Sequence, residues 1–358
     1  MKRIVLFVIA VSILFSSLAY ACTDFQIKAK DKSIVIGRSM EFPVDLKSNI
    51  IVVPRGQQFN VMDSKKVKGL SWTAKYGYLA LNAYNIPDTY VEGLNEAGLA
   101  FEGLMYTGAV YQPVVAGKYI PLDKLGAWLM GNFATVAEVK AALATTNISQ
   151  SEIKQLKDMG LHVAIHDAAG NNLVVEFIDG KANVYDNPNG VMTNRPNFEW
   201  QLTNLRNYVN LHASDAEDKM VNGIKIEPTG VGSGMLGLPG DWTPASRFVR
   251  VSYCVDAAIK PKDAKGAEVL AEHILNIVDI PMGVIKESPA PFVTMYGYAQ
   301  WVLIKDLTNQ VLYFKTYDNT AWKSVSLKKF DLSAGKPVKV MPVDSNQLSA
   351  IDVSGNFK

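Results

Sequence analysis

Residues 22–42 read CTDFQIKAKDKSIVIGRSMEF. They predict a β-hairpin, with one strand over 22–28, a turn over 29–32 and a second strand over 33–39. Such a hairpin places Cys22 opposite residues 38–40. Because cross-strand neighbours on one face lie about 5 Å apart at Cβ, Arg38 can reach the Cys22 thiol. Its neighbours Ile36 and Met40 indicate a partly buried face, and a guanidinium there favours the thiolate.

The sequence ahead of Cys22 has the three parts of a secretory signal peptide. Lys2 and Arg3 begin it, an apolar run covers 4–15, and Ala19-Tyr20-Ala21 ends it. We therefore predict cleavage between Ala21 and Cys22 and export to the periplasm or the medium. Cleavage leaves Cys22 with a free α-amine, which titrates near pH 8 and serves as a general base beside the thiol. This is the arrangement of an N-terminal nucleophile.

Two other interpretations of Cys22 stay open on this stretch alone. In a lipoprotein the cysteine after the signal is acylated and holds the protein to a membrane. The lipoprotein pattern has Leu three places before the cysteine and a small residue two places before, where this chain has Ala19 and Tyr20. Alternatively, a cysteine happens to follow a cleavage site without chemical function.

Composition excludes several classes of protein. The chain has 358 residues, with 36 Lys and Arg against 34 Asp and Glu, and Lys2 and Arg3 belong to the signal. The charge of the remainder is balanced and no basic cluster is present, so we expect no nucleic-acid partner. Beyond the signal no apolar stretch is long enough to cross a bilayer. We predict a signal peptide over 1–21 and a single domain over 22–358.

The cysteines and histidines indicate no metal site. Cys22 and Cys254 are the only cysteines, and a bridge between them would consume the candidate nucleophile. Cys254 lies in an apolar helical run, where a small core residue is the better interpretation. The four histidines, His162, His166, His212 and His273, have no metal-binding spacing. His162 and His166 lie in a strand-like run, which favours ordinary sheet positions.

The rest of the chain predicts strands at both ends and helices between them. The expected strands cover 49–53, 72–75, 78–83, 91–106, 161–166, 173–178, 182–185, 293–299, 301–306, 310–317 and 321–326. The expected helices cover 121–133, 135–145, 198–209 and 264–277, and another opens at Thr243-Pro244. This order favours an α+β fold, a four-layer αββα sandwich of antiparallel sheets with Cys22 opening into a cleft.

Two later segments present further polar residues. Pro196 pushes Arg195 into an extended conformation, so Asn194 ends a strand. In the helix that opens at Thr243, Arg247 lies in the first turn of an apolar stripe. The glycine-rich stretch 230–237 lacks the ending of a phosphate-binding loop, which argues against a nucleotide site.

Four segments together resemble one known family. CTDFQIKAKDKSIVIGRSMEF, GLNEAGLAFEGLMY, GVMTNRPNFEWQLTNLRNY and LGLPGDWTPASRFVRVSY are similar in order and spacing to the choloylglycine hydrolase/penicillin V acylase family of N-terminal nucleophile amidases. The resemblance covers essentially the whole chain after the signal. It implies an αββα fold, hydrolysis of linear non-peptide amides, no cofactor, and a homotetramer. The stretch 202–235 resembles the assembly loop of some members.

The resemblance also implies roles for particular residues. Cys22 would be the nucleophile, Arg38 would stabilise the thiolate, and Arg247 would hold the hydrogen-bond network. The side chain of Asn194 and the backbone N–H of Met105 would form the oxyanion hole. Glu41 stands where the family has Asp.

Met105 takes the place of the Asn or Tyr that separates bile-salt hydrolases from penicillin acylases, so the substrate class stays open. We expect Met40, Phe42, Met105 and Tyr106 to form an apolar or aromatic acyl pocket. An N-acyl homoserine lactone acylase and a lipid-anchored or inactive binding protein on the same fold are the alternatives.

Overall fold

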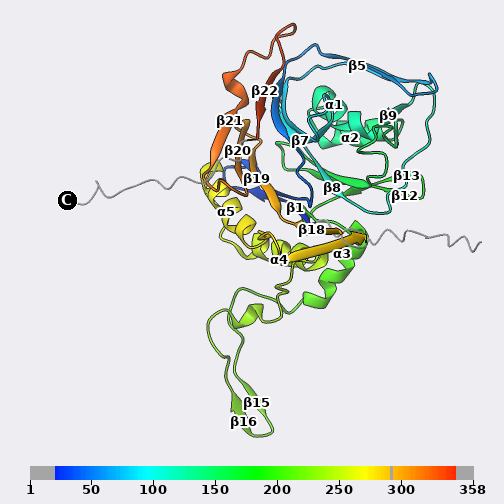
Figure 1. Ribbon diagram of the computed structural model, residues 1–358. Coiled ribbons are helices and arrows are strands. Elements are labelled where there is room, and N and C mark those ends of the chain that lie inside the picture. The colour runs from blue at the N-terminus through cyan, green and yellow to red at the C-terminus, as the bar shows by residue number, and fades with distance from the viewer. Residues whose placement is uncertain (1–20, 291–292, 344–358) are drawn as a thin grey trace, which may run out of the picture.

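The computed structural model describes residues 21–290 and 293–343 of the protein (Figure 1). Two antiparallel sheets are stacked face to face. The six-stranded sheet runs in the order β14 (Val191–Met192), β1 (Cys22–Lys28), β2 (Ile34–Glu41), β19 (Ala299–Asp306), β20 (Val311–Thr316) and β21 (Lys323–Ser326). The eight-stranded sheet runs in the order β13 (Lys181–Asp186), β12 (Asn172–Ile178), β11 (Leu161–His166), β8 (Ala100–Met105), β7 (Tyr90–Asn95), β6 (Tyr78–Asn82), β3 (Asn49–Val53) and β22 (Lys339–Pro342).

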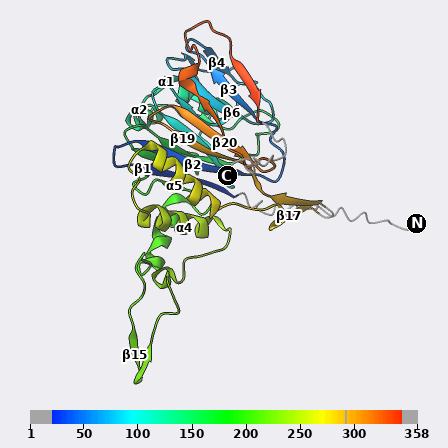
Figure 2. The ribbon, with the colours of Figure 1, turned by 90° about the vertical axis from the view of Figure 1, so that its left-hand side faces the viewer.

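Helices cover the outer face of each sheet. On the six-stranded sheet, α4 (Pro244–Ala257) packs against β1, and α5 (Ala264–Asn276) packs against β2 and β19. On the eight-stranded sheet, α1 (Leu122–Asn132) packs against β7 and β8, and α2 (Val136–Leu143) packs against β12. Figures 1 and 2 show these helix pairs on opposite sides of the stacked sheets. The predicted four-layer αββα sandwich is therefore confirmed.

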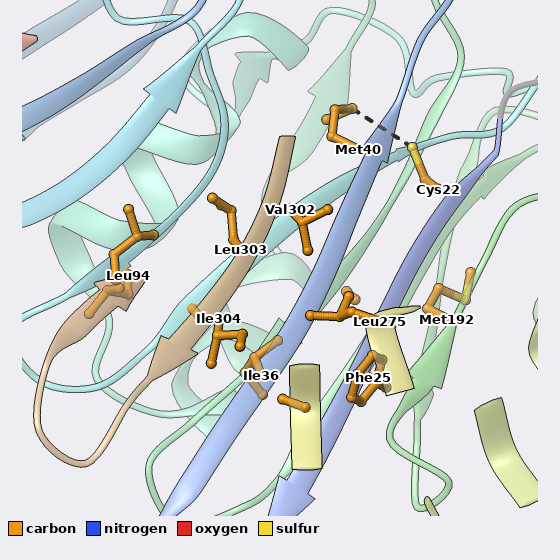
Figure 3. Close-up of a cluster of buried hydrophobic side chains, with 14 of the residues drawn as sticks. Cys22, Phe25, Ile36, Met40, Leu94, Met192, Leu275, Val302, Leu303 and Ile304 are labelled. Atoms are coloured by element: carbon orange, nitrogen blue, oxygen red, sulfur yellow. Dashed lines mark hydrogen bonds between the residues drawn. The ribbon is translucent and has the colours of Figure 1, made fainter. Parts of the chain in front are cut away.

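Two groups of buried apolar side chains fill the layers. One lies between the sheets and under α5, where it includes Phe25, Ile36 and Leu275 (Figure 3). The other lies between the eight-stranded sheet and the pair α1 and α2. A glycine permits the close approach of α1, because a Cβ at Gly93 would overlap the sulfur of Met130.

Charged side chains also lie between the sheets. Lys305 of β19 donates to Glu92 of β7 at 2.7 Å and to Glu102 of β8, and all three are fully buried. The Nε atom of Arg38, on β2, lies 3.9 Å from Glu92. Burial raises the pKa of Glu102, and the neighbouring Glu92 raises it further, against the effect of Lys305. The cluster joins the sheets, and it gives the buried Arg38 the partner that the sequence requires.

Several elements differ from the sequence-based expectation. The chain also forms β4 (Gln58–Met62), β17 (Ile285–Ala290) and β22, and β5 covers Lys68–Thr73 in place of 72–75. β18 (Val293–Gly297) ends two residues early. β5 and β22 have no fully buried side chain, so their sequences lack the regular alternation that predicts a strand, whereas β4 does alternate and was missed.

A long excursion follows α3 (Phe198–Asn204) and the 3₁₀ turn Leu205–Tyr208. The segment 209–242 extends away from the sandwich and carries the hairpin β15 (Lys219–Val221) and β16 (Ile224–Ile226) near its tip (Figures 1 and 2). We call this segment the arm. Every residue of its two strands is exposed, so the strands have no buried face from which the sequence could predict the hairpin.

The part of the chain described here holds no helix with both the length and the apolar character needed to cross a bilayer. The predicted signal peptide covers 1–21, and all of it except Ala21 lies outside the described residues.

Candidate active site

Cys22 is the first residue of β1, a strand inside the six-stranded sheet, and is 1% exposed. It pairs with Met40 of β2, and its Sγ atom lies 3.8 Å from Met40 Sδ (Figure 3). The backbone oxygen of Glu41 lies 3.9 Å from the same sulfur. Because Ala21 precedes it in this chain, the Cys22 nitrogen is an amide with a single N–H, and that N–H is donated to Asn194 Oδ1 at 2.7 Å.

Asn194 reaches Cys22 because β14 pairs with β1, in the register Met192 with Asp24. Its Oδ1 accepts from both the Cys22 nitrogen and Arg247 Nη2, the latter at 3.0 Å. Its Nδ2 donates to the Met105 carbonyl at 2.8 Å. A side-chain amide has two N–H donors, so this bond leaves one for another acceptor. The structure thus brings together three residues that the resemblance assigned to one site.

Arg247 lies in the first turn of α4, where the sequence placed it. Thr243 caps the helix by accepting from the Ser246 N–H, and Pro244 follows as the first helical residue. The Arg247 guanidinium is fully buried and donates to the Cys22 carbonyl at 2.6 Å and to Thr23 Oγ1 at 2.7 Å. Burial lowers the pKa of Arg247, and the charges of Glu41 and Cys22 oppose that effect. The guanidinium holds the first two residues of β1.

Arg38 pairs across the hairpin with Asp24 and not with Cys22 itself. Its side chain runs between the sheets, where Nη2 lies 2.9 Å from the Gly103 carbonyl and 3.7 Å from Met40 Sδ. Burial opposes the charged guanidinium, but Cys22, as thiolate, and the carboxylate of Glu92 outweigh it and raise the pKa of Arg38. Arg38 is therefore a permanent positive charge beside the thiol.

Glu41 is a fully buried carboxyl group at the end of β2. No described residue makes a hydrogen bond to either of its oxygens. Burial raises the pKa of Glu41 to about 7, against the opposing charges of Arg247 and Arg38 and the nearby Ser39 hydroxyl. The Cys22 N–H goes to Asn194 and not to Glu41 in this chain, in which Cys22 has only one such donor.

A narrow cavity with a volume of about 50 Å³ opens at Cys22. Met40, Phe42 and Met105, three of the four residues expected to form the acyl pocket, line it. Tyr106, which the sequence suggested for the same pocket, is not among the residues that line this cavity. Its ring packs on His162, with 5.0 Å between ring centroids. Met105 therefore lines the cavity, whereas the next residue, Tyr106, does not.

Other residues of this site were not predicted. Leu46, Tyr84, Leu156, Met159 and Leu161 complete the wall, and they come from separate segments that carry no motif. Thr23 was also missed, although its place beside the nucleophile was a usable signal.

The two strand histidines occupy ordinary sheet positions, as expected. His166 Nε2 lies 2.8 Å from Asp24 Oδ2, and His162 bonds to Glu176 and to the Thr193 carbonyl. Neither approaches Cys22 as a base would. Cys254 is a half-buried thiol in α4, packed against the core. Within 21–290 and 293–343 no three His, Cys, Asp or Glu side chains gather as a metal site would require.

Comparison with known proteins gives a consistent result. The family model described as linear amide C–N hydrolases, choloylglycine hydrolase family, matches residues 22–348. The chain is 32% identical to a bile salt hydrolase/transferase of Clostridium perfringens, over 88% of this chain and 95% of that protein.

Two solved structures are similar to this fold. A crystal structure of a conjugated bile acid hydrolase variant from Clostridium perfringens superposes with a TM-score of 0.81 at 32% identity, covering 93% of this chain and all of the other. A penicillin V acylase from Agrobacterium tumefaciens superposes with a TM-score of 0.74 at 25% identity, covering 91% and 93% of the two chains.

Proposed function

The chain belongs to the choloylglycine hydrolase family and is a hydrolase of linear amide C–N bonds, and we propose that it works through a thioester formed on Cys22. The observation that carries this proposal is the convergence of Asn194 and Arg247 on the backbone of Cys22. Both side chains are buried and orient the backbone of one cysteine. A cysteine with only a packing role needs no such support.

The proposed reaction begins once residues 1–21 have been removed. The α-amine of Cys22 then takes the thiol proton, and the thiolate attacks the carbonyl carbon of the amide. The oxyanion accepts hydrogen bonds from the remaining N–H of Asn194 and from the Met105 backbone. The C–N bond breaks as the ammonium group returns the proton to the leaving nitrogen, which departs as an amine.

Deacylation repeats these steps with water. The α-amine takes a proton from water, the resulting hydroxide attacks the thioester, and the tetrahedral intermediate collapses to a free acid and the Cys22 thiol. Each oxyanion donor contributes about 3–4 kcal/mol in comparable acyl transfer. Arg38 supports the attacking form, since its buried positive charge beside Cys22 favours a thiolate.

The cavity supports an apolar or aromatic acyl group. Its walls are largely Leu, Met, Val, Tyr and Phe side chains, and such pockets select by burial more than by hydrogen bonds. Three methionines, Met40, Met105 and Met159, add adaptable surface. We expect phenoxyacetyl, steroid-like or fatty acyl groups, with loose requirements on the amine that leaves.

We also propose export and assembly. Support for export comes from the signal-like sequence before Cys22, with Ala21 as the last residue removed. Support for a homotetramer comes from the arm, which presents exposed apolar side chains that a partner subunit would cover, among them Val209, Met220, Ile224, Val231 and Leu236. Light scattering on the exported protein should give four chains, and Ile224→Asp combined with Ile226→Asp should lower that number.

The main experiment uses purified mature protein. It is incubated with penicillin V, glycine- and taurine-conjugated bile salts and N-acyl homoserine lactones, and mass spectrometry follows both product and protein. We expect turnover of at least one linear amide and an adduct of the acyl mass on Cys22. Cys22→Ala should show neither. Turnover by that variant, or an N-terminal Cys22 carrying a lipid, would reject this mechanism.

A further inference from the structure

Asp123 occupies an unusual place beside the proposed acyl pocket. Among the described residues, it is the only one that lines both the cavity at Cys22 and a second cavity beside β4. The second cavity has a volume of about 440 Å³. It lies in the first turn of α1, outside the eight-stranded sheet, whereas Cys22 belongs to the six-stranded sheet. The narrow cavity therefore connects the nucleophile in one layer with a carboxylate in another.

Asp123 is also the only charged residue among those that line the narrow cavity. The residue is 8% exposed. Oδ1 accepts from the Ser151 hydroxyl at 2.6 Å, while Oδ2 receives no hydrogen bond from a described residue and lies 3.9 Å from Lys124 Nζ. An acid in the first turn of a helix stabilises that helix, but this role does not require the carboxylate to line two cavities.

The second cavity carries an excess of acidic side chains. Four carboxyl groups, those of Asp63, Asp88, Asp123 and Glu152, line it together with a single ammonium group, that of Lys124. Ser149 lines it too, and its hydroxyl is buried with no hydrogen-bond partner among the described residues. Ser149 pairs with Pro121, two residues before Asp123, so hydroxyl and carboxylate lie on neighbouring elements. A buried polar group without a partner is unfavourable unless a ligand or water meets it.

We propose that the far end of the acyl group carries a hydrogen-bond donor, a hydroxyl or ammonium group, which binds Asp123 Oδ2 and Ser149 Oγ. This inference rests on the proposed function, because it assumes that the acyl chain lies in the cavity at Cys22. The apolar walls bind the middle of the chain, and the acidic cavity binds its end. An acyl group that ends in a carboxylate is rejected, since it meets three uncompensated negative charges.

A series of synthetic amides tests this proposal. All share one amine and differ in the length of a linear acyl chain and in its end, which is methyl, hydroxyl, ammonium or carboxylate. At the chain length that reaches Asp123, kcat/KM for the hydroxyl or ammonium end should exceed that for the carboxylate end by at least about tenfold. Asp123→Asn should remove most of this preference, measured as the ratio of kcat/KM for the hydroxyl or ammonium end to kcat/KM for the carboxylate end.

Ratios between substrates are measured on one preparation, so they do not depend on how much of a variant folds. Ser149→Ala provides a second variant and should weaken the preference for the hydroxyl end. Asp88→Asn is the matched control, because Asp88 lines the acidic cavity but not the cavity at Cys22.

The outcomes separate the two proposals. If no amide of the series or of the substrate panel is hydrolysed, the proposed function fails. The inference about Asp123 is wrong if methyl-ended chains are hydrolysed and the wild type hydrolyses all end groups at the same rate. It is also wrong if Asp123→Asn keeps the wild-type preference. In both cases the proposed amidase function still stands.

Discussion

The side-chain oxygen of Asn194 lies 2.7 Å from the backbone nitrogen of Cys22, although 172 positions separate the two residues. The same asparagine donates from its amide nitrogen to the Met105 carbonyl. One side chain therefore connects the nucleophile's nitrogen to the opposite sheet. This relation links the position of the proposed base to that of the proposed oxyanion hole.

Activity should require Cys22 both as a thiol and as the first residue. A protein that keeps Ala21 in front of Cys22 has an amide in place of the α-amine and therefore lacks a base near neutral pH. We expect both this protein and Cys22→Ala to lose turnover in steady-state assays. Full activity of the extended protein, with its N-terminus verified by mass spectrometry, would falsify the self-base mechanism.

Asn194→Ala should lower kcat by about 10²–10³ with little change in KM, because an oxyanion donor acts mainly in the transition state. Initial rates over a range of substrate concentrations separate the two constants. Asn189→Ala is a suitable control, since Asn189 bonds to Ser252 and not to Cys22. A raised KM at unchanged kcat would show that Asn194 binds the ground state and the transition state equally, which contradicts its role as an oxyanion donor.

Arg247→Lys should lower kcat more than tenfold while preserving the charge. A lysine cannot reproduce the fork that holds the Cys22 carbonyl, Thr23 Oγ1 and Asn194 Oδ1 together. Arg250→Lys, on the same helix, removes hydrogen bonds to the Pro239 and Ile277 carbonyls and should leave kcat unchanged. Equal effects of the two changes on kcat would indicate that both arginines act only through helix stability.

Glu41 should make stability depend on pH. Its pKa is about 7 in the folded protein against 4.5 ordinarily, so the folded state holds the proton more tightly. The tighter proton binding adds to the free energy of unfolding. This stabilisation is fully present below about pH 4.5 and is lost as the pH rises to about 7, a loss on the order of 3 kcal/mol. Urea unfolding of protein that retains Ala21 should show this loss in the wild type and not in Glu41→Gln. Parallel pH profiles of the two proteins would contradict the assignment.

Met105→Tyr and Met105→Asn should each shift the ratio of penicillin V to bile-salt turnover, because Met105 lines the cavity at Cys22. Competition between the two substrates in one assay measures this ratio directly. Tyr106→Phe should leave it unchanged, since that ring packs on His162 outside the cavity. A constant ratio in both active Met105 variants would place the specificity elsewhere.

The sequence by itself determined the layers and most local positions. The β1–β2 hairpin, the end of β14 before Asn194 and the capped start of α4 before Arg247 all follow from turn chemistry, proline geometry and apolar spacing. These signals act over a few residues, so they can be read without knowing the fold. The four motifs that indicated the family lie at such places.

Only the tertiary structure decided which of these residues meet. The pairing of β14 with β1 brings Asn194 to Cys22, and α4 brings Arg247 to the same backbone. Met105, the last residue of β8, lines the cavity, whereas the ring of the next residue, Tyr106, packs on His162. Asp123 joins the cavity through the packing of α1. Such contacts depend on how whole layers stack to bury their apolar faces, and no short stretch of sequence carries that information.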